Sequence, residues 1–172
     1  DAVLNIATNP TCTRTFSQHS HATTGEFDLE YKLSDNTNVY AKYARGYRQG
    51  SVNPRGVGFL VTFGQEQVDL YEAGLKTNWR GAMPGYFNVS VFTNEFADQQ
   101  LQLSYIGRGS PTSGICACGT STIQGFEMDG SISPFKGFNF SGALAYLDTD
   151  LKTFDYPAVG PAGFPTPVVD AN

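Results

Sequence analysis

Residues 38–54 read NVYAKYARGYRQGSVNP, a stretch whose first half alternates and whose second half breaks into glycine, asparagine and proline. In the first half, Val39, Ala41 and Tyr43 fall on one face of an extended chain, opposite a tyrosine and a lysine. This alternation predicts a β-strand, because successive side chains of a strand point to opposite faces. The glycines, asparagine and proline that follow predict a loop. The stretch therefore predicts a strand with two different faces that runs directly into a polar loop.

The same period of two recurs in five further segments, and no segment has a convincing helical period. The predicted strands cover residues 27–33, 38–45, 66–79, 86–92, 121–133 and 138–146. The composition agrees, since 13 Phe, 9 Tyr and 1 Trp favour strands and 19 Gly favour the turns between them. The sequence therefore predicts an all-β chain of about six antiparallel up-and-down strands in three hairpins.

The predicted connections differ in length in a regular way. Three are short, at 34–37, 80–85 and 133–137, and they alternate with long stretches at about 47–65, at 103–119 and after 151. Alternate connections of an up-and-down sheet lie at the same end, so the short turns share one end and the long loops the other. Outer-membrane β-barrels have this asymmetry, whereas a soluble sandwich more often mixes loop lengths at both ends.

The two faces of the predicted sheet differ in chemistry. The polar face carries Asp28, Glu30, Lys32, Lys42, Glu72, Lys76, Glu127 and Asp129. The apolar face carries aromatic residues near the strand ends, which are candidates for interfacial girdles: Tyr31, Tyr43, Trp79, Phe87, Phe138 and Tyr146. Periodicity alone leaves open whether the apolar face meets lipid or packs in a sandwich core. The loop pattern favours the transmembrane β-barrel, with Val39, Ala41 and Tyr43 facing lipid.

Four segments, in this order, resemble the β-barrel of TonB-dependent outer-membrane receptors. They are VYAKYARGYRQGSVNP (39–54), EQVDLYEAGLKTNW (66–79), NVSVFTNEFADQQ (88–100) and GFEMDGSISPFKGFNFSGALAYLDT (125–149). The resemblance is strongest over residues 26–150 and implies a barrel of about 22 strands with a plug domain in its lumen. No plug, TonB box or final aromatic strand is recognised. Residues 1–172 are therefore expected to form part of the barrel domain, as a fragment without the plug.

The resemblance also implies a function. The parent protein would lie in the outer membrane of a Gram-negative bacterium, in contact with lipid and lipopolysaccharide. It would take up a scarce, large ligand, usually a ferric siderophore, with energy from the TonB complex acting through the plug. It would need no cofactor and would not be an enzyme. Two alternatives stay open: a passive or adhesive outer-membrane barrel, and a soluble all-β binding module. A net charge of −5 without a basic run argues against a nucleic-acid partner.

Candidate site residues follow from the predicted faces and loops. Tyr47, Arg48 and Arg55, in the first long loop, are the candidates for ligand contact, although each arginine could equally be solvated or paired within the protein. Glu72, Lys76, Glu127 and Asp129 are expected to face the lumen as wall residues, in cross-strand pairs or against the plug. No catalytic triad order, phosphate-binding loop or zinc motif is found, so no catalytic or metal residue is assigned.

The three cysteines allow one disulfide. Cys12 is the candidate partner of either Cys116 or Cys118, which leaves one thiol over. Cys-x-Cys can also bind a metal, but two further ligands would be needed close by.

Overall fold

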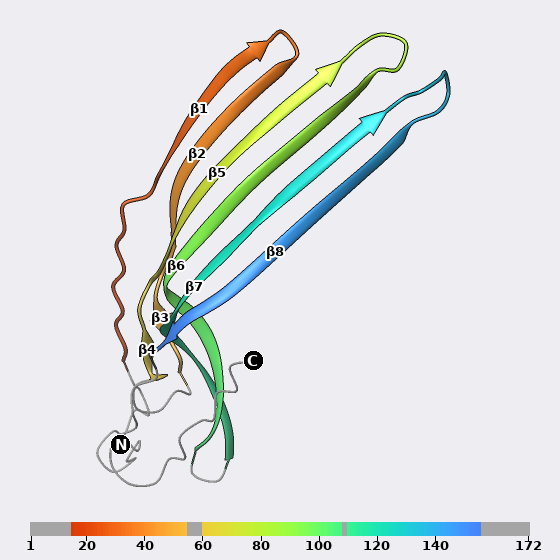
Figure 1. Ribbon diagram of the computed structural model, residues 1–172. Coiled ribbons are helices and arrows are strands. Elements are labelled where there is room, and N and C mark those ends of the chain that lie inside the picture. The colour runs from red at the N-terminus through yellow and green to blue at the C-terminus, as the bar shows by residue number, and fades with distance from the viewer. Residues whose placement is uncertain (1–14, 55–59, 108–109, 156–172) are drawn as a thin grey trace, which may run out of the picture.

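The computed structural model of the protein describes residues 15–54, 60–107 and 110–155. These residues form a large antiparallel sheet and a small two-stranded sheet (Figure 1). The strands are β1 (Gly25–Ser34), β2 (Thr37–Arg48), β3 (Ser51–Val52), β4 (Thr62–Phe63), β5 (Glu66–Trp79), β6 (Gly85–Gly107), β7 (Ser110–Ile132) and β8 (Phe140–Phe154). Each of the six predicted segments coincides with a strand of the large sheet, the last two to within one or two residues at the turn between them, which confirms the all-β class. Within the described ranges, no helix has the length and apolar character needed to cross a membrane.

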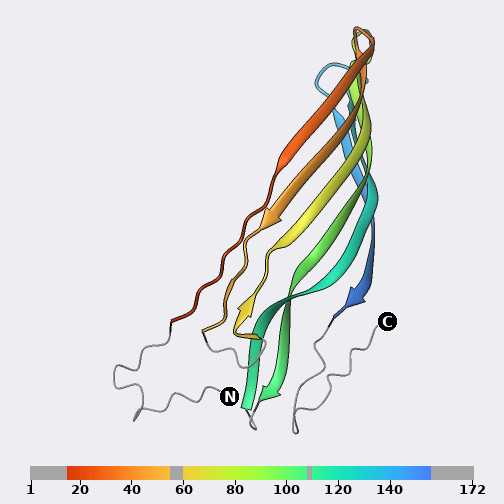
Figure 2. The same ribbon diagram turned by 90° about the vertical axis from the view of Figure 1, so that its left-hand side faces the viewer.

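The large sheet has the up-and-down order β1-β2-β5-β6-β7-β8, and every neighbouring pair is antiparallel. β3 and β4 stand outside this order, because they pair with each other in the connection between β2 and β5. β1 and β8 each have one edge without a neighbouring strand among the described residues. Figure 2 shows the sheet from the side, where its strands twist together along their length, as expected from the right-handed twist of β-strands.

The short connections lie together at one end of the sheet. They join β1 to β2, β5 to β6 and β7 to β8 at the top of Figure 1. The β2–β5 connection and the tip of the β6–β7 hairpin lie at the opposite end. The prediction that the three short turns share one end of the sheet is therefore confirmed. At the other end, the connection between β2 and β5 is long, as predicted, whereas β6 and β7 are joined differently.

β6 and β7 are much longer than predicted, at 23 residues each. The prediction of a loop from Leu103 to Gly119 is wrong, because the two strands stay paired until Gly107 lies opposite Ser110. The register shifts beside Asp98, which has a φ of 52°. This bulge bends the strand, and beyond it the hairpin continues past the ends of its neighbours (Figure 1). In the extension of β7, the buried positions are occupied by small residues, Gly114, Cys116 and Cys118, so the sequence shows no alternation of large apolar and polar side chains.

The pairing register keeps like residues in continuous rows across the large sheet. One row on the apolar face consists of Leu29, Ala41, Ala73, Val91, Phe126 and Tyr146. The next row, on the opposite face, consists of Glu30, Tyr40, Gly74, Ser90, Glu127 and Ala145. Because the register is unbroken here, the two faces predicted for single strands extend over the whole sheet.

The apolar face is not covered by other parts of the described chain. Phe27 on β1 is 66% exposed and Tyr146 on β8 is 58% exposed. The buried apolar side chains instead gather at the long-loop end, where they are Leu60, Phe63, Cys116 and Cys118. A broad apolar face of this kind marks a surface that another apolar phase covers.

Candidate functional site

On the polar face, three of the four predicted wall residues form cross-strand contacts, and the fourth, Glu127, lies on the same face opposite Ser90. The Tyr40 hydroxyl donates a hydrogen bond to Glu72, and the Lys76 ammonium lies 4.8 Å from the centre of the Tyr40 ring. On the neighbouring strand pair, Asn88 Nδ2 donates to both Asp129 oxygens at 3.2 Å. These charges therefore have partners of opposite polarity on adjacent strands, as a water-facing sheet wall requires.

The structure gives a physical reason for the glycine at position 74, one of the motif residues. It is paired with Tyr40 in the register, and a Cβ on Gly74 would lie only 2.5 Å from Cε1 of the tyrosine ring. The ring therefore covers the glycine, a cross-strand arrangement that compensates for the missing side chain. In this position Tyr40 reaches both Glu72 and Lys76. The glycine thus positions a polar cluster on the wall.

The apolar face ends at aromatic residues that are followed by charges. Towards the long-loop end, the next residue on the same face is charged in three strands. It is Arg45 beyond Tyr43, Asp148 beyond Tyr146, and Asp69 beyond Tyr71, which it precedes by two residues in the sequence. This order, aromatic and then charged, is typical of a membrane–water boundary. From Tyr71 to Trp79, eight residues rise about 27 Å along the strand, or about 20 Å across a membrane at a tilt of about 40°, close to the roughly 25 Å apolar band of such barrels.

The residues at this boundary are linked to one another. Arg45 binds Asp69 through two hydrogen bonds of 2.7 Å, from Nε and from one terminal nitrogen. The Tyr43 hydroxyl donates to the same carboxylate at 2.7 Å, and the Tyr43 and Tyr71 rings lie 5.2 Å apart. Above the apolar band, the hydrogen-bonded Arg45 guanidinium lowers the pKa of the Asp69 carboxyl. The carboxylate therefore stays ionised beside the aromatic band.

The predicted ligand-contact residues do not converge. Tyr47 and Arg48 are consecutive in β2, so their side chains leave opposite faces of the strand. Arg48 lies on the polar face, with its side chain 61% exposed, and forms an ion pair with Glu66 at 2.8 Å. Arg55 lies outside the described residues. Arg48 is therefore the candidate whose side chain is held by an ion pair while most of it stays exposed.

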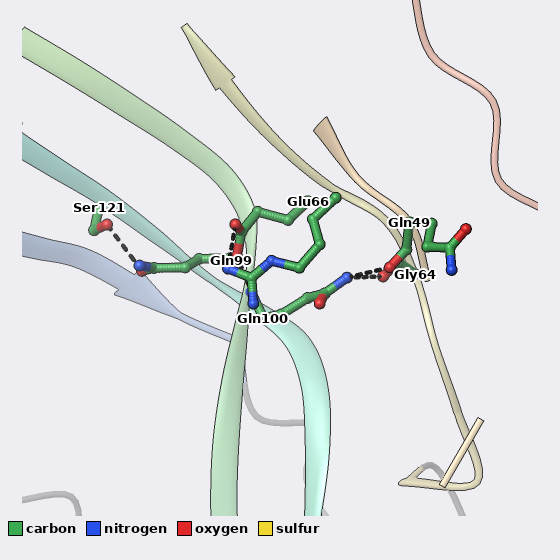
Figure 3. Close-up of polar contacts among 7 residues, drawn as sticks. Gln49, Gly64, Glu66, Gln99, Gln100 and Ser121 are labelled. Atoms are coloured by element: carbon green, nitrogen blue, oxygen red, sulfur yellow. Dashed lines mark hydrogen bonds and ion pairs between the residues drawn. The ribbon is translucent and has the colours of Figure 1, made fainter. Parts of the chain in front are cut away.

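Sequence reasoning missed the polar network around Glu66. Its carboxylate accepts hydrogen bonds from Arg48 and from the main-chain N–H of Gln100, at 2.8 and 2.6 Å. The Gln100 amide donates to the carbonyls of Gln49 and Gly64, as Figure 3 shows. The contact between Glu66 and Gln100 joins residues 34 apart in sequence, so no local pattern reveals this network. The one available signal was that Glu66 belongs to a recognised motif.

The cysteine pairing differs from the pairing that was expected. Cys116 and Cys118 form a disulfide with each other, with Cα atoms 5.3 Å apart, within the range that a disulfide can join. Cys12, the predicted partner, lies outside the described residues. Elsewhere in the described part of the chain, no group of three or more His, Cys, Asp or Glu side chains could hold a metal ion.

These features define the class of protein. An antiparallel up-and-down sheet with one uncovered apolar face, aromatic boundaries, a polar opposite face and short turns at one end is part of the wall of a membrane β-barrel. A family model described as "TonB dependent receptor-like, beta-barrel" matches residues 4–169. The chain therefore belongs to the TonB-dependent receptor β-barrel family, as the resemblance implied. No solved structure matches the chain.

Membership of the family carries a general function. TonB-dependent receptors are outer-membrane receptors and transporters of Gram-negative bacteria that take large ligands, and the family is not one of enzymes. In the wall of such a barrel, an apolar face meets lipid and a polar face meets the lumen.

Proposed function

We propose that this chain forms part of the wall of a TonB-dependent receptor that imports a ferric siderophore across the outer membrane. The remaining strands and the plug would be supplied by other parts of the same receptor. The observation that carries the proposal is the family match over residues 4–169, together with a sheet whose two faces suit lipid and lumen. The uncovered edges of β1 and β8 support continuation of the sheet on both sides.

The arrangement of charges supports transport rather than chemistry. Glu72, Lys76 and Asp129 are engaged in contacts between neighbouring strands. A lumen wall of this kind stabilises the barrel and meets the plug, while the energy for import comes from the TonB complex. Lipopolysaccharide and lipid would cover the opposite face. Ligand contact would fall at the long-loop end, where Arg48 presents its guanidinium at the mouth of the lumen side.

The test is uptake of radioactive iron by cells that carry the full-length receptor as their sole siderophore receptor. We expect uptake from a ferric siderophore that disappears when either the receptor or TonB is deleted. Parallel assays with cobalamin and with oligosaccharides separate the ligand classes. Receptor-dependent uptake that persists without TonB would refute energised transport and favour a passive barrel. Uptake of one of the other ligands alone would refute the siderophore assignment.

A further inference from the structure

Glu66 is a charged side chain in an almost closed position, with only 5% of the residue exposed. A buried carboxylate is stable only when its oxygens are paired and hydrogen-bonded. Both oxygens are occupied: Oε1 accepts from Arg48 at the end of β2, and Oε2 accepts from the N–H of Gln100 in β6. A single side chain at the start of β5 therefore joins the strands on either side of it.

Gln100 extends this connection into the β2–β5 loop. Its side-chain amide donates to the carbonyl of Gln49 at 2.9 Å and to that of Gly64 at 3.0 Å. These two carbonyls lie at opposite ends of the loop, close to β2 and to β5 (Figure 3). The ends also run close together, since any side chain on Gly50 would collide with the main-chain oxygen of Phe63. Gln100 therefore binds the base of the loop to β6.

We call a set of contacts that holds the β2–β5 loop against the β6–β7 hairpin a tie, and the contacts of Glu66 and Gln100 are the first. A second tie lies nearer the tip of the loop. Asn53 donates to the carbonyls of Leu60 and Ile115, at 2.6 and 2.9 Å, and accepts from the N–H of Ile115 at 3.3 Å. Leu60 is 1% exposed and packs against Cys116 of β7. The loop is thus attached to the β6–β7 hairpin by two separate sets of contacts, one polar and the other both polar and apolar.

We propose that Glu66 is a positioning residue that joins the β2–β5 loop and the β6–β7 hairpin into one cooperative unit and fixes the direction of the Arg48 guanidinium. Each of the two ties holds the loop close enough to the hairpin for the other tie to form. Loosening one tie therefore weakens the other. The unit therefore opens as a whole, and any ligand that contacts Arg48 meets a preset surface. That last step rests on the proposed function, whereas the cooperative unit itself does not.

The test is hydrogen exchange measured by mass spectrometry on the full-length receptor in detergent, without ligand. The two variants are Glu66→Gln, which removes the charge at one tie, and Asn53→Ala, which removes the other. In each variant the decisive signal comes from the tie that was not mutated. In Asn53→Ala we expect the main-chain amide of Gln100, which donates to Glu66, to exchange about 10-fold faster. In Glu66→Gln we expect the same acceleration at the Ile115 amide.

The matched control is Glu95→Gln, which neutralises an exposed carboxylate of β6 and should leave both amides unchanged. If each variant speeds exchange only at its own tie, the segments move independently and the proposal is overturned. If Glu66→Gln prevents folding, Asn53→Ala still decides the matter through the Gln100 amide. Because no ligand enters the experiment, its failure is distinguishable from a failure of the uptake proposal.

Discussion

The contact between Gly74 and Tyr40 predicts that alanine at position 74 changes the stability of the receptor in opposite directions, depending on whether the Tyr40 ring is present. In Gly74→Ala the new Cβ would lie 2.5 Å from Cε1 and 2.7 Å from the hydroxyl oxygen of Tyr40. Carbon atoms in contact prefer about 3.5–4.0 Å, so the ring must move by about 1 Å. That movement weakens the hydrogen bond from Tyr40 to Glu72. Overpacking costs about 1–3 kcal/mol, and because the ring is only partly buried we expect about 1–2 kcal/mol.

The double mutant tests the cause. With Tyr40→Ala in place the obstructing ring is gone, and alanine is then favoured over glycine in a strand by about 0.5–1 kcal/mol. Gly74→Ala should therefore destabilise the native receptor but stabilise the Tyr40→Ala variant. The assay is guanidinium unfolding of the full-length receptor in detergent, followed by tryptophan fluorescence. Gly142→Ala is the control, because no atom lies within 4 Å of its added Cβ. Equal effects of Gly74→Ala in both backgrounds would refute the reasoning.

Three further predictions concern the lipid face, its boundary and the disulfide. Val91→Arg, on the apolar face where Val91 is 56% exposed, should lower the free energy of unfolding in a lipid bilayer by about 2–4 kcal/mol. Ser90→Arg, on the opposite face, should lower it much less, and equal losses would contradict the assignment of the two faces. Arg45→Ala should cost only about 0.5–1 kcal/mol in the same unfolding assay, because its side chain is 45% exposed, and a loss several times larger would place the ion pair in a closed environment. Peptide mapping of the oxidised receptor without reductant should find Cys116 bonded to Cys118, and a bond from either to another cysteine would contradict this pairing.

The sequence was sufficient for the large sheet because lipid and water impose a period of two. Every strand that separates the two environments shows that period, and the register then continues it from β1 to β8. Part of the aromatic boundary could also be read from the sequence, since Tyr43 and Tyr146, two of the predicted girdle residues, each precede a charged residue on the same face.

The features beyond the barrel wall could not be read in this way. The β6–β7 extension carries small residues such as Gly114 and Cys116, which pack against Leu60 from a distant loop. The buried residues of this part of β7 are small, and the residue that covers them comes from a distant loop, so no strand could be recognised from the local sequence. Glu66 was visible as a motif residue, but its burial depends on Gln100, and no local rule connects two residues on different strands.

The account depends above all on which face of β5 meets lipid. The most direct test places single spin labels at Glu72, Ala73, Leu75 and Lys76 of the full-length receptor in lipid vesicles, with the native cysteines replaced. Accessibility to oxygen, which concentrates in lipid, is then compared with accessibility to a water-soluble nickel complex. We predict that labels at Ala73 and Leu75 are accessible to oxygen, while labels at Glu72 and Lys76 are accessible only to the nickel complex. Equal nickel accessibility at all four positions would contradict the assignment of a lipid face and a lumen face.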